Sequence, residues 1–420
     1  MSATVVTPVR KASLALRIAL ILTVVACAAW LGISRQFYAD AIVDAFFALA
    51  LASVIIIHLR VRPSWTDGAL IVAGMCILGA SHVAVAHEAP RIMAWFSFAG
   101  LTSFTILSIR SIWDFEQRSL LYAWVPAALF VASDYFASTM LAWTSRVQPR
   151  TLDLYLLSFD GSLGRLISFD VGRVYASVTW FHVCALIAYI GLALPIAMVY
   201  AGRLVRFRQG ALPVMLAFVI TGPVGIVLYN LFPACGPHDL LGAAFPFHPI
   251  ADSDLQRLLL DPVAIQGPRN AMPSLHMSWT LLAWWYSRGL SWTERIVAFA
   301  FLAWTVVATL GTGEHYVADL IVAFPFSLMI QTLCLRDVRW RDSSRWIAFV
   351  AGASATVAWL IALRYAVQVF WYSPLIPWML SAVTVAFVCW RQNLLARAGD
   401  VTARAPAVTE FGRSPAHAVR

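Results

Sequence analysis

The sequence predicts an all-α polytopic membrane protein with about twelve transmembrane helices. Its 420 residues are 61% hydrophobic and only 12% charged, whereas about a quarter of the residues of a soluble domain are charged. Apolar runs of the length that crosses a bilayer, roughly 17–25 residues, recur along the whole chain. The shortage of charge excludes a disordered chain and a nucleic-acid-binding protein, although the net charge is +9.

The twelve predicted spans are distributed along the whole chain. They lie at 13–33, 41–59, 68–86, 92–109, 120–142, 178–201, 211–232, 274–288, 294–312, 315–334, 346–366 and 374–390. The runs that begin at 274 and 374 are short and bounded by proline. We expect a disordered cytoplasmic tail at 392–420.

The distribution of basic residues predicts the orientation in the membrane. If the N-terminus is cytoplasmic, 20 of the 30 Lys and Arg residues lie in inner segments and eight in outer segments. Basic residues concentrate on the cytoplasmic side of membrane proteins. We therefore expect a bacterial-type inner (plasma) membrane protein with both termini cytoplasmic, and we attribute the positive charge to topology rather than to an acidic partner.

Two outer segments are too long to be simple connections. They cover about 143–177 and 233–273, and the second is rich in proline. In the second, residues 252–260 have the pattern of a capped interfacial helix. Long loops on one face of a bundle commonly carry function, so we expect the active site on the periplasmic, or extracytoplasmic, face.

Cysteine usage indicates neither a disulfide framework nor a metal site. Five of the six cysteines lie inside apolar runs, and Cys235 alone falls in a polar loop. None of the spacings is typical of a metal site. We expect no metal and no cofactor.

The first motif, Pro273-Ser274-Leu275-His276, opens the predicted span at 274–288. Free N–H groups and the positive end of the helix dipole make such a helix start an anion site that phosphate commonly occupies. Arg269 and Asn270, just before it, add a cation that can bind two oxygens and an amide donor. Ser274 is expected either to contact this phosphate or to cap the helix.

The second motif places His315 four residues before Asp319, at the start of the predicted span 315–334. Residues four apart lie on one face of a helix, so the carboxylate can hold the imidazole in one tautomer. An imidazole held in this way is a candidate nucleophile toward phosphorus. The predicted topology brings His276 to the same membrane face, where it can protonate a leaving oxygen and deprotonate an incoming hydroxyl.

Together the two motifs resemble those of the type-2 phosphatidic acid phosphatase superfamily, whose members share a six-helix core. The resemblance covers about residues 120–335 and implies that this region is the six-helix catalytic core. An N-terminal four-helix membrane region (1–119) would precede it, and two C-terminal membrane helices (336–391) would follow it. Three departures point to one branch: Leu275 replaces the glycine of Pro-Ser-Gly-His, Ala308-Thr309 replaces a Ser-Arg pair, and the first motif, with its lysine and arginine, has no clear counterpart. With the loop Phe232-Pro233 to Pro237, the chain is similar to inositol phosphorylceramide synthases, the inositolphosphotransferase branch.

This resemblance implies an enzyme of lipid metabolism, a membrane lipid phosphotransferase. It would move a phospho-head group, inositol-phosphate-like, from a phospholipid donor to a lipid or alcohol acceptor. His315 would carry the group as a phosphohistidine, with His276 and Asp319 as the other catalytic residues. Tyr229 and Asn230, at the outer end of the span 211–232, are further candidates for contact with the head group.

Two alternatives stay open. Water could replace the acceptor alcohol, which would make the protein a lipid phosphate phosphatase. In a different class, twelve spans suit a transporter or flippase whose histidines relay protons. An internal repeat would favour that class, and none is evident by eye. The sequence leaves open the donor head group, the acceptor, the role of the first four and last two helices, and the oligomeric state.

Overall fold

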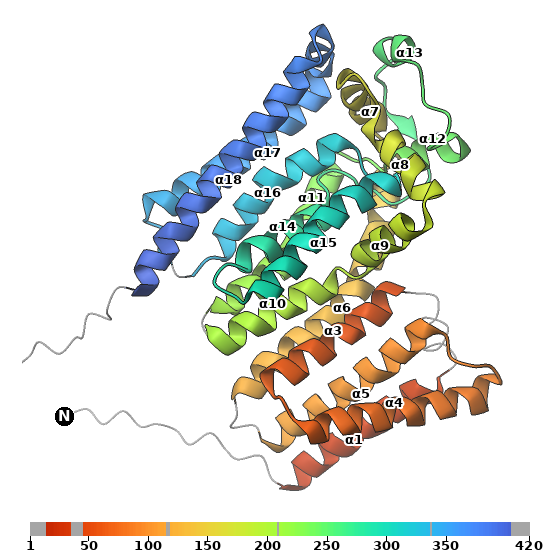
Figure 1. The fold of residues 1–420 in the computed structure, drawn as a ribbon, viewed down its shortest axis with the longest axis vertical. Coiled ribbons are helices and arrows are strands. Elements are labelled where there is room, and N and C mark those ends of the chain that lie inside the picture. The colour runs from red at the N-terminus through yellow and green to blue at the C-terminus, as the bar shows by residue number, and fades with distance from the viewer. Residues whose placement is uncertain (1–13, 35–44, 115–117, 208–209, 337, 405–420) are drawn as a thin grey trace, which may run out of the picture. The chain divides into compact units, whose positions relative to one another are not determined.

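The structure is a computed structural model that describes residues 14–34, 45–114, 118–207, 210–336 and 338–404. Within these residues the chain is almost entirely helical (Figure 1), which confirms the all-α prediction. Eight described helices are long and apolar enough to cross a membrane, or nine if the bent pair α8 (Ile167–Ser177) and α9 (Thr179–Ile190) forms one span. The chain is a multi-pass membrane protein.

The four N-terminal helices match the first four predicted spans. They are α1 (Leu14–Ile33), α3 (Ala45–Val61), α4 (Trp65–Ala86) and α5 (Ile92–Trp113); residues 13 and 41–44 of the predicted spans lie outside the described residues. In α5, a Cβ added at Gly100 would lie 2.4 Å from the carbonyl group of Leu51 in α3. The absence of a side chain at Gly100 therefore allows α3 and α5 to pack backbone against backbone.

The middle of the chain differs from the prediction because several helices are interrupted. The helices here are α6 (Arg118–Val147), α9, α10 (Ala193–Arg206), α11 (Leu212–Leu231), α14 (Leu275–Tyr286), α15 (Trp292–Gly311) and α16 (Val317–Cys334). The predicted span 178–201 is divided between α9 and α10, and α14 has only 12 residues. Two other predicted spans are also short: α3 has 17 residues, and only part of α6 is apolar. These four cases explain why eight long spans are found among the described residues instead of the twelve predicted.

The two long segments predicted on the outer face, called the outer segments, contain short helices and are joined by a small sheet. The first holds α7 (Asp153–Ser162) and α8; the second holds α12 (Pro237–Leu241), a 3-10 turn (Gly242–Ala244) and α13 (Asp252–Gln256). Strand β1 (Arg150–Thr151) pairs antiparallel with β2 (Val263–Ala264). The helix predicted at 252–260 ends at Gln256, and its Leu255 is buried in the protein core.

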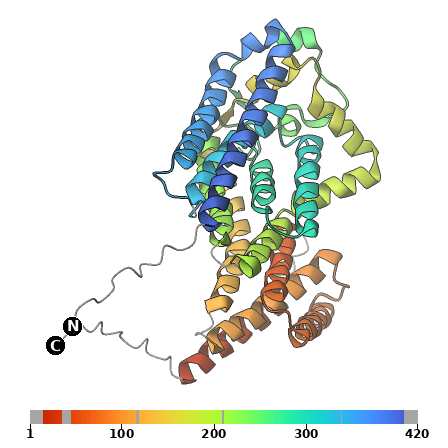
Figure 2. The ribbon, with the colours of Figure 1, turned by 60° about the vertical axis from the view of Figure 1, so that its left-hand side comes forward.

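The C-terminal part consists of α17 (Ser343–Tyr365), the 3-10 helix η3 (Val367–Tyr372) and α18 (Leu375–Arg404). The helices α16, α17 and α18 lie side by side in both views (Figures 1 and 2). α18 continues to Arg404, so the tail predicted to be disordered from 392 is helical over its first residues. Residues 405–420 lie outside the described residues.

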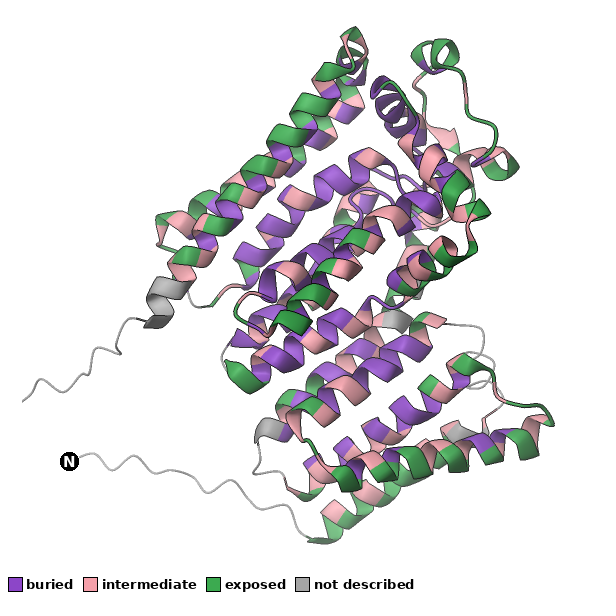
Figure 3. Cartoon of the chain, in the orientation of Figure 1, coloured by how far each residue is buried: buried purple, intermediate pink, exposed green. Residues whose placement is uncertain are grey.

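The chain forms two compact units. The first contains Met1–Ala142, His182–Met215 and Ala283–Thr305, and the second contains Trp143–Phe181, Leu216–Leu282 and Val306–Arg420. In the second unit α16 is buried along most of its length, whereas α17 and α18 are more exposed (Figure 3). Many of the exposed side chains on α17 and α18 are large and apolar. Exposed apolar faces of this kind are what lipid covers in a membrane protein. All of the predicted site residues belong to the second unit.

The core of the second unit surrounds α7. It gathers the aromatic side chains Tyr155, Phe159, Phe169, Phe232, Phe245, Tyr316, Trp359 and Phe370. The ring of Phe159 meets those of Phe370 and Trp359 edge-on, with centroids 5.0 and 5.6 Å apart. Because such aromatic contacts add to the gain from burial, α7 is held firmly between the C-terminal helices and the loops that carry the two motifs.

Candidate active site

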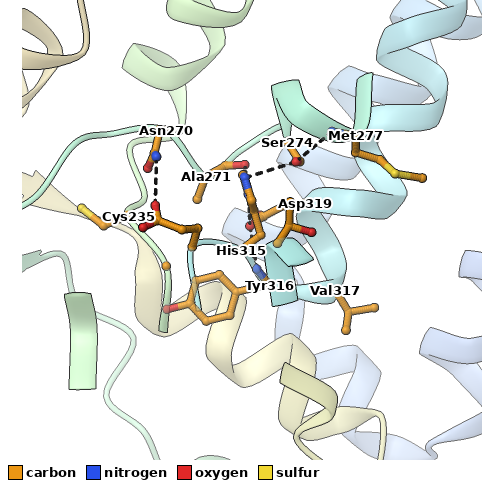
Figure 4. Close-up of polar contacts among 12 residues, drawn as sticks. Cys235, Asn270, Ala271, Ser274, Met277, His315, Tyr316, Val317 and Asp319 are labelled. Atoms are coloured by element: carbon orange, nitrogen blue, oxygen red, sulfur yellow. Dashed lines mark hydrogen bonds and ion pairs between the residues drawn. The ribbon is translucent and has the colours of Figure 1, made fainter. Parts of the chain in front are cut away.

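The structure places His315 on the loop before α16, not on the helix as the sequence predicts. The helix begins at Val317 because the carboxylate of Asp319 turns back and accepts the backbone N–H of Tyr316 at 2.8 Å. The same oxygen, Oδ2, lies 3.4 Å from Nδ1 of His315. The predicted pair therefore meets through a helix cap rather than along a helix face (Figure 4).

Two further contacts fix the imidazole of His315, whose side chain is 1% exposed. Its Nδ1 lies 3.1 Å from the carbonyl oxygen of Ala271, and its Nε2 lies 3.2 Å from Oγ of Ser274. Because a carbonyl oxygen only accepts, Nδ1 carries the proton of the neutral ring and donates it to Ala271. Nε2 then has a free lone pair, which accepts the hydroxyl proton of Ser274.

Ser274 also caps α14. Its Oγ accepts the backbone N–H of Met277 at 3.3 Å while its hydroxyl proton is directed at His315 (Figure 4). The backbone N–H of Ser274 donates to the carbonyl oxygen of Asp319 at 3.3 Å. The starts of α14 and α16 are thus tied to each other through residues of both motifs.

His276, the second residue of α14, lies next to His315. Their ring centroids are 6.4 Å apart with an angle of 67° between the ring planes. A nucleophile approaches its target atom to about 3–3.5 Å, and a general acid reaches the leaving oxygen over about 2.6–3.2 Å. One phosphoryl group between the two rings would satisfy both distances.

Arg269, which the sequence predicts as a phosphate ligand, is buried among protein acceptors in the structure. The residue is 2% exposed, and all five N–H groups of its guanidinium donate to protein acceptors. These acceptors are the carbonyl oxygens of Gln148, Pro149, Ile265 and Gly267 and the sulfur of Cys235. As arranged, Arg269 ties the two outer segments together, and no donor remains for a phosphate.

The other three predicted binding residues differ in position. The hydroxyl of Tyr229 lies near the backbone of Leu275, at the start of α14. Asn270 donates from its amide to Oε2 of Glu314 at 3.2 Å, one residue before His315 (Figure 4). The amide of Asn230 instead donates to a carbonyl of its own helix at 2.8 Å. The structure thus brings Tyr229 and Asn270 to the candidate site and turns the amide donor of Asn230 to its own helix.

Two buried carboxylates beside the site had no role in the sequence analysis. Asp153 and Asp160 of α7 are both 0% exposed. Burial raises the pKa of both side chains. Hydrogen bonds from Thr151, Gly236, Cys235 and Tyr316 oppose the increase at Asp153, and those from Val317 and Ala318 oppose it at Asp160. Their sequence signal is a spacing of seven residues, which sets two carboxylates on one face of an otherwise apolar helix.

Two further carboxylates, Asp239 and Glu314, lie near each other beside the candidate site. Burial, followed by the negative charge of Glu314, raises the pKa of Asp239 on α12. Gly267 lies close beside this carboxylate, since a Cβ there would be 2.4 Å from Oδ2 of Asp239. Within the described parts of the chain, no group of three or more His, Cys, Asp or Glu side chains could hold a metal ion.

Comparison with protein families gave one match. Residues 154–333 match the family model described as PAP2 superfamily, a segment that includes both motifs and ends at the last turn of α16. Members of this superfamily are phosphatases and phosphotransferases, so the match supports an enzyme of the same superfamily. Comparisons with curated proteins and with solved structures each gave no significant match.

Proposed function

We propose that this chain, with its PAP2 superfamily segment, is a membrane lipid phosphotransferase of the inositolphosphotransferase type. It moves a phospho-head group from a phospholipid to a lipid alcohol at the extracytoplasmic face of a bacterial-type inner membrane. The proposal depends on one observation: the imidazoles of His276 and His315 lie 6.4 Å apart, and the second has its Nδ1 atom held by Ala271 and Asp319. Residues 120–335 form the catalytic core in this proposal, with four helices before it and two after it.

In the first step, Nε2 of His315 attacks the phosphorus of the donor. The P–O bond to the lipid alcohol breaks as the N–P bond forms, and His276, in its cationic form, gives its proton to the departing oxygen. The hydroxyl of Ser274, which donates to Nε2 in the free enzyme, is then available to a phosphoryl oxygen. The positive charge on the phosphohistidine is balanced by Asp319, whose Oδ2 is 3.4 Å from Nδ1.

In the second step, the acceptor hydroxyl takes the place of the departed alcohol. His276, now neutral, removes the proton of this hydroxyl, and the oxygen attacks the phosphorus as the N–P bond breaks. His315 returns to its neutral form and His276 to its cationic form. No proton, electron or further reactant is consumed, so the cycle transfers the head group without a cofactor.

The arrangement of cations favours a phosphodiester as the donor. Arg269 is committed to protein acceptors, so in the proposed mechanism the phosphoryl oxygens depend on His276 and on Ser274. A phosphomonoester carries a charge of about −1.5 to −2 near neutral pH, whereas a phosphodiester carries a single negative charge. The diester therefore needs less neutralisation, which suits a phospholipid with an intact head group.

The direct test follows a labelled head group. Purified protein in detergent is incubated with phospholipids carrying radioactive phosphorus, phosphatidylinositol first, with and without a panel of lipid alcohols. We expect a labelled product lipid that requires the alcohol, and an acid-labile label on the wild-type protein. His315→Ala should lose both signals. His248→Ala provides the matched control, because it removes an exposed histidine from the second outer segment.

Three other outcomes would each lead to a different conclusion. Release of the phosphorylated head group or of phosphate at equal rate without any alcohol would identify a phosphatase that uses water. A label that persists on His315→Ala would refute the assignment of the nucleophile. Proton-coupled uptake into vesicles with no turnover of any phospholipid would instead support a transporter.

A further inference from the structure

The helix α7 directs two buried carboxylates toward the residues between His315 and Asp319. Asp153 and Asp160 are seven residues apart, about two helical turns, so they lie on the same face of α7. Both are 0% exposed. Burying a carboxylate is costly unless hydrogen bonds compensate, so their partners indicate what the two side chains hold.

Asp160 holds the first residue of α16. Both of its carboxylate oxygens accept the backbone N–H of Val317, each at 3.1 Å. This N–H group has no partner within the helix, because the first turn of a helix leaves its donors unsatisfied. Asp160 therefore anchors the backbone at a point between His315 and Asp319.

Asp153 holds the preceding residue and the neighbouring loop. It accepts the hydroxyl of Tyr316 at 3.0 Å, and it also accepts the backbone N–H groups of Cys235 and Gly236 at 3.1 and 2.8 Å. The loop of Gly236 fits closely against residue 313, since a Cβ at Gly236 would lie 2.5 Å from the carbonyl oxygen of Gly313. The side chain of Tyr316 is itself fully buried.

We propose that Asp153 and Asp160 are positioning residues, which hold residues 316 and 317 so that His315 keeps the orientation required for attack on phosphorus. The catalytic part of this inference rests on the proposed function. Each carboxylate acts through the backbone or through Tyr316 rather than through direct contact with an imidazole.

The sensitivity of the His315 contacts explains why such anchoring matters. The imidazole is held on one side by Ala271 at 3.1 Å and on the other by Ser274 at 3.2 Å. Hydrogen bonds of this length weaken steeply when distance and angle depart from their optimum. A displacement of about 1 Å at the reacting group can cost roughly 100-fold in rate, so loss of an anchor at residue 317 should reach the chemistry.

The test combines a reactivity measurement with kinetics. Full-length wild type, Asp160→Ala and Asp160→Asn are treated with diethyl pyrocarbonate, and the modification of each histidine is followed by mass spectrometry. In Asp160→Ala we expect His315, nearly inaccessible in the wild type, to react about fivefold faster as its segment opens. In the same variant kcat should fall by about 10- to 100-fold, with KM changed by less than about twofold.

Asp160→Asn should restore both readouts nearly to wild type, because its amide keeps one oxygen to accept the Val317 N–H. Asp170→Asn is the matched control: it removes a carboxylate from α8 that is 27% exposed and paired with Arg165 and Arg173. Neither readout should change in this control. The exposed His87 and His248 serve as internal references for the reagent.

Three results would overturn the inference. The first is a folded Asp160→Ala in which the reactivity of His315 is unchanged. The second is an equal loss of kcat in Asp160→Asn and Asp160→Ala. The third is an Asp170→Asn variant that changes His315 reactivity and kcat as much as Asp160→Ala does. If Asp160→Ala does not fold, Tyr316→Phe decides the question, because it removes only the hydroxyl bond to Asp153; unchanged His315 reactivity and kcat would then refute the proposal. If the wild type transfers no head group, the proposed function is wrong. The reactivity of His315 toward diethyl pyrocarbonate still tests whether Asp160 positions it.

Discussion

Nδ1 of His315 lies 3.1 Å from the carbonyl oxygen of Ala271, a fully buried residue of the loop before α14. This contact gives the imidazole a second acceptor besides Asp319. A backbone carbonyl cannot be protonated in the physiological range, so it holds the proton on Nδ1 whatever the state of the carboxylate. The orientation of the proposed nucleophile is therefore set from two elements at once.

Asp319→Asn should reduce turnover without abolishing it. In serine hydrolases, where the carboxylate sets the tautomer, the same change costs about 10⁴-fold in kcat. Because Ala271 still accepts from Nδ1 of His315, we expect a loss of about 10- to 100-fold, measured as initial rates over a range of phospholipid concentrations. A loss as complete as that of His315→Ala would show that the carbonyl does not set the tautomer.

Ser274→Ala and Ser274→Gly should separate capping from chemistry. Alanine at an N-cap costs about 1 kcal/mol relative to serine, whereas glycine costs only a few tenths of that amount. Both variants lose the hydroxyl that donates to Nε2 of His315. We expect equal losses of kcat, with a lower Tm only in Ser274→Ala; a loss of activity that follows Tm would assign Ser274 to capping alone.

Arg269→Lys should damage the fold rather than substrate binding. Lysine offers three donors from one nitrogen in place of the planar five-donor group, so several buried carbonyls of the outer segments lose their partner. Each such loss costs about 1–3 kcal/mol. We expect a lower Tm with an unchanged KM for the phospholipid. A raised KM at unchanged Tm would instead show that Arg269 contacts the phosphate.

Trp371→Phe should weaken the attachment of the C-terminal helices to α7. The indole N–H of Trp371 in η3 donates to Oγ of Ser158 in α7 at 3.0 Å. Its loss should lower the free energy of unfolding by about 1 kcal/mol, visible as a lower Tm in detergent. Trp292→Phe, at a position 74% exposed on α15, should leave Tm unchanged. Equal Tm values for both variants would contradict the attachment.

The pH dependence of stability should report on Asp160. Burial raises the pKa of this carboxyl above the value of about 3.9 expected in the unfolded chain, so the folded state binds the proton more tightly. The resulting stabilisation is present at acid pH and is lost as pH rises through the raised pKa. We therefore expect the Tm of the wild type to fall relative to that of Asp160→Asn as pH increases. A difference that stays constant with pH would contradict the raised pKa.

Local patterns in the sequence were sufficient to predict the class of the protein and to identify the residues of the two motifs. Hydrophobic runs identify membrane helices because each helix must satisfy its own backbone inside lipid. The pattern is less informative where a run is divided, as between α9 and α10, because hydropathy continues across a break in the backbone. It also placed His315 on α16, although the helix begins two residues later, because the cap made by Asp319 is not visible in hydropathy.

Tertiary structure alone decided which groups surround the two histidines. The carbonyl of Ala271 lies 44 residues from His315 in the chain, and Val317 lies 157 residues from Asp160. Arg269, an apparent phosphate ligand in the sequence, finds acceptors about 120 residues away in Gln148 and Pro149. Composition and spacing reflect constraints within one helix or loop, whereas hydrogen bonds between distant segments depend on how the whole chain packs, and these bonds determine the geometry of the site.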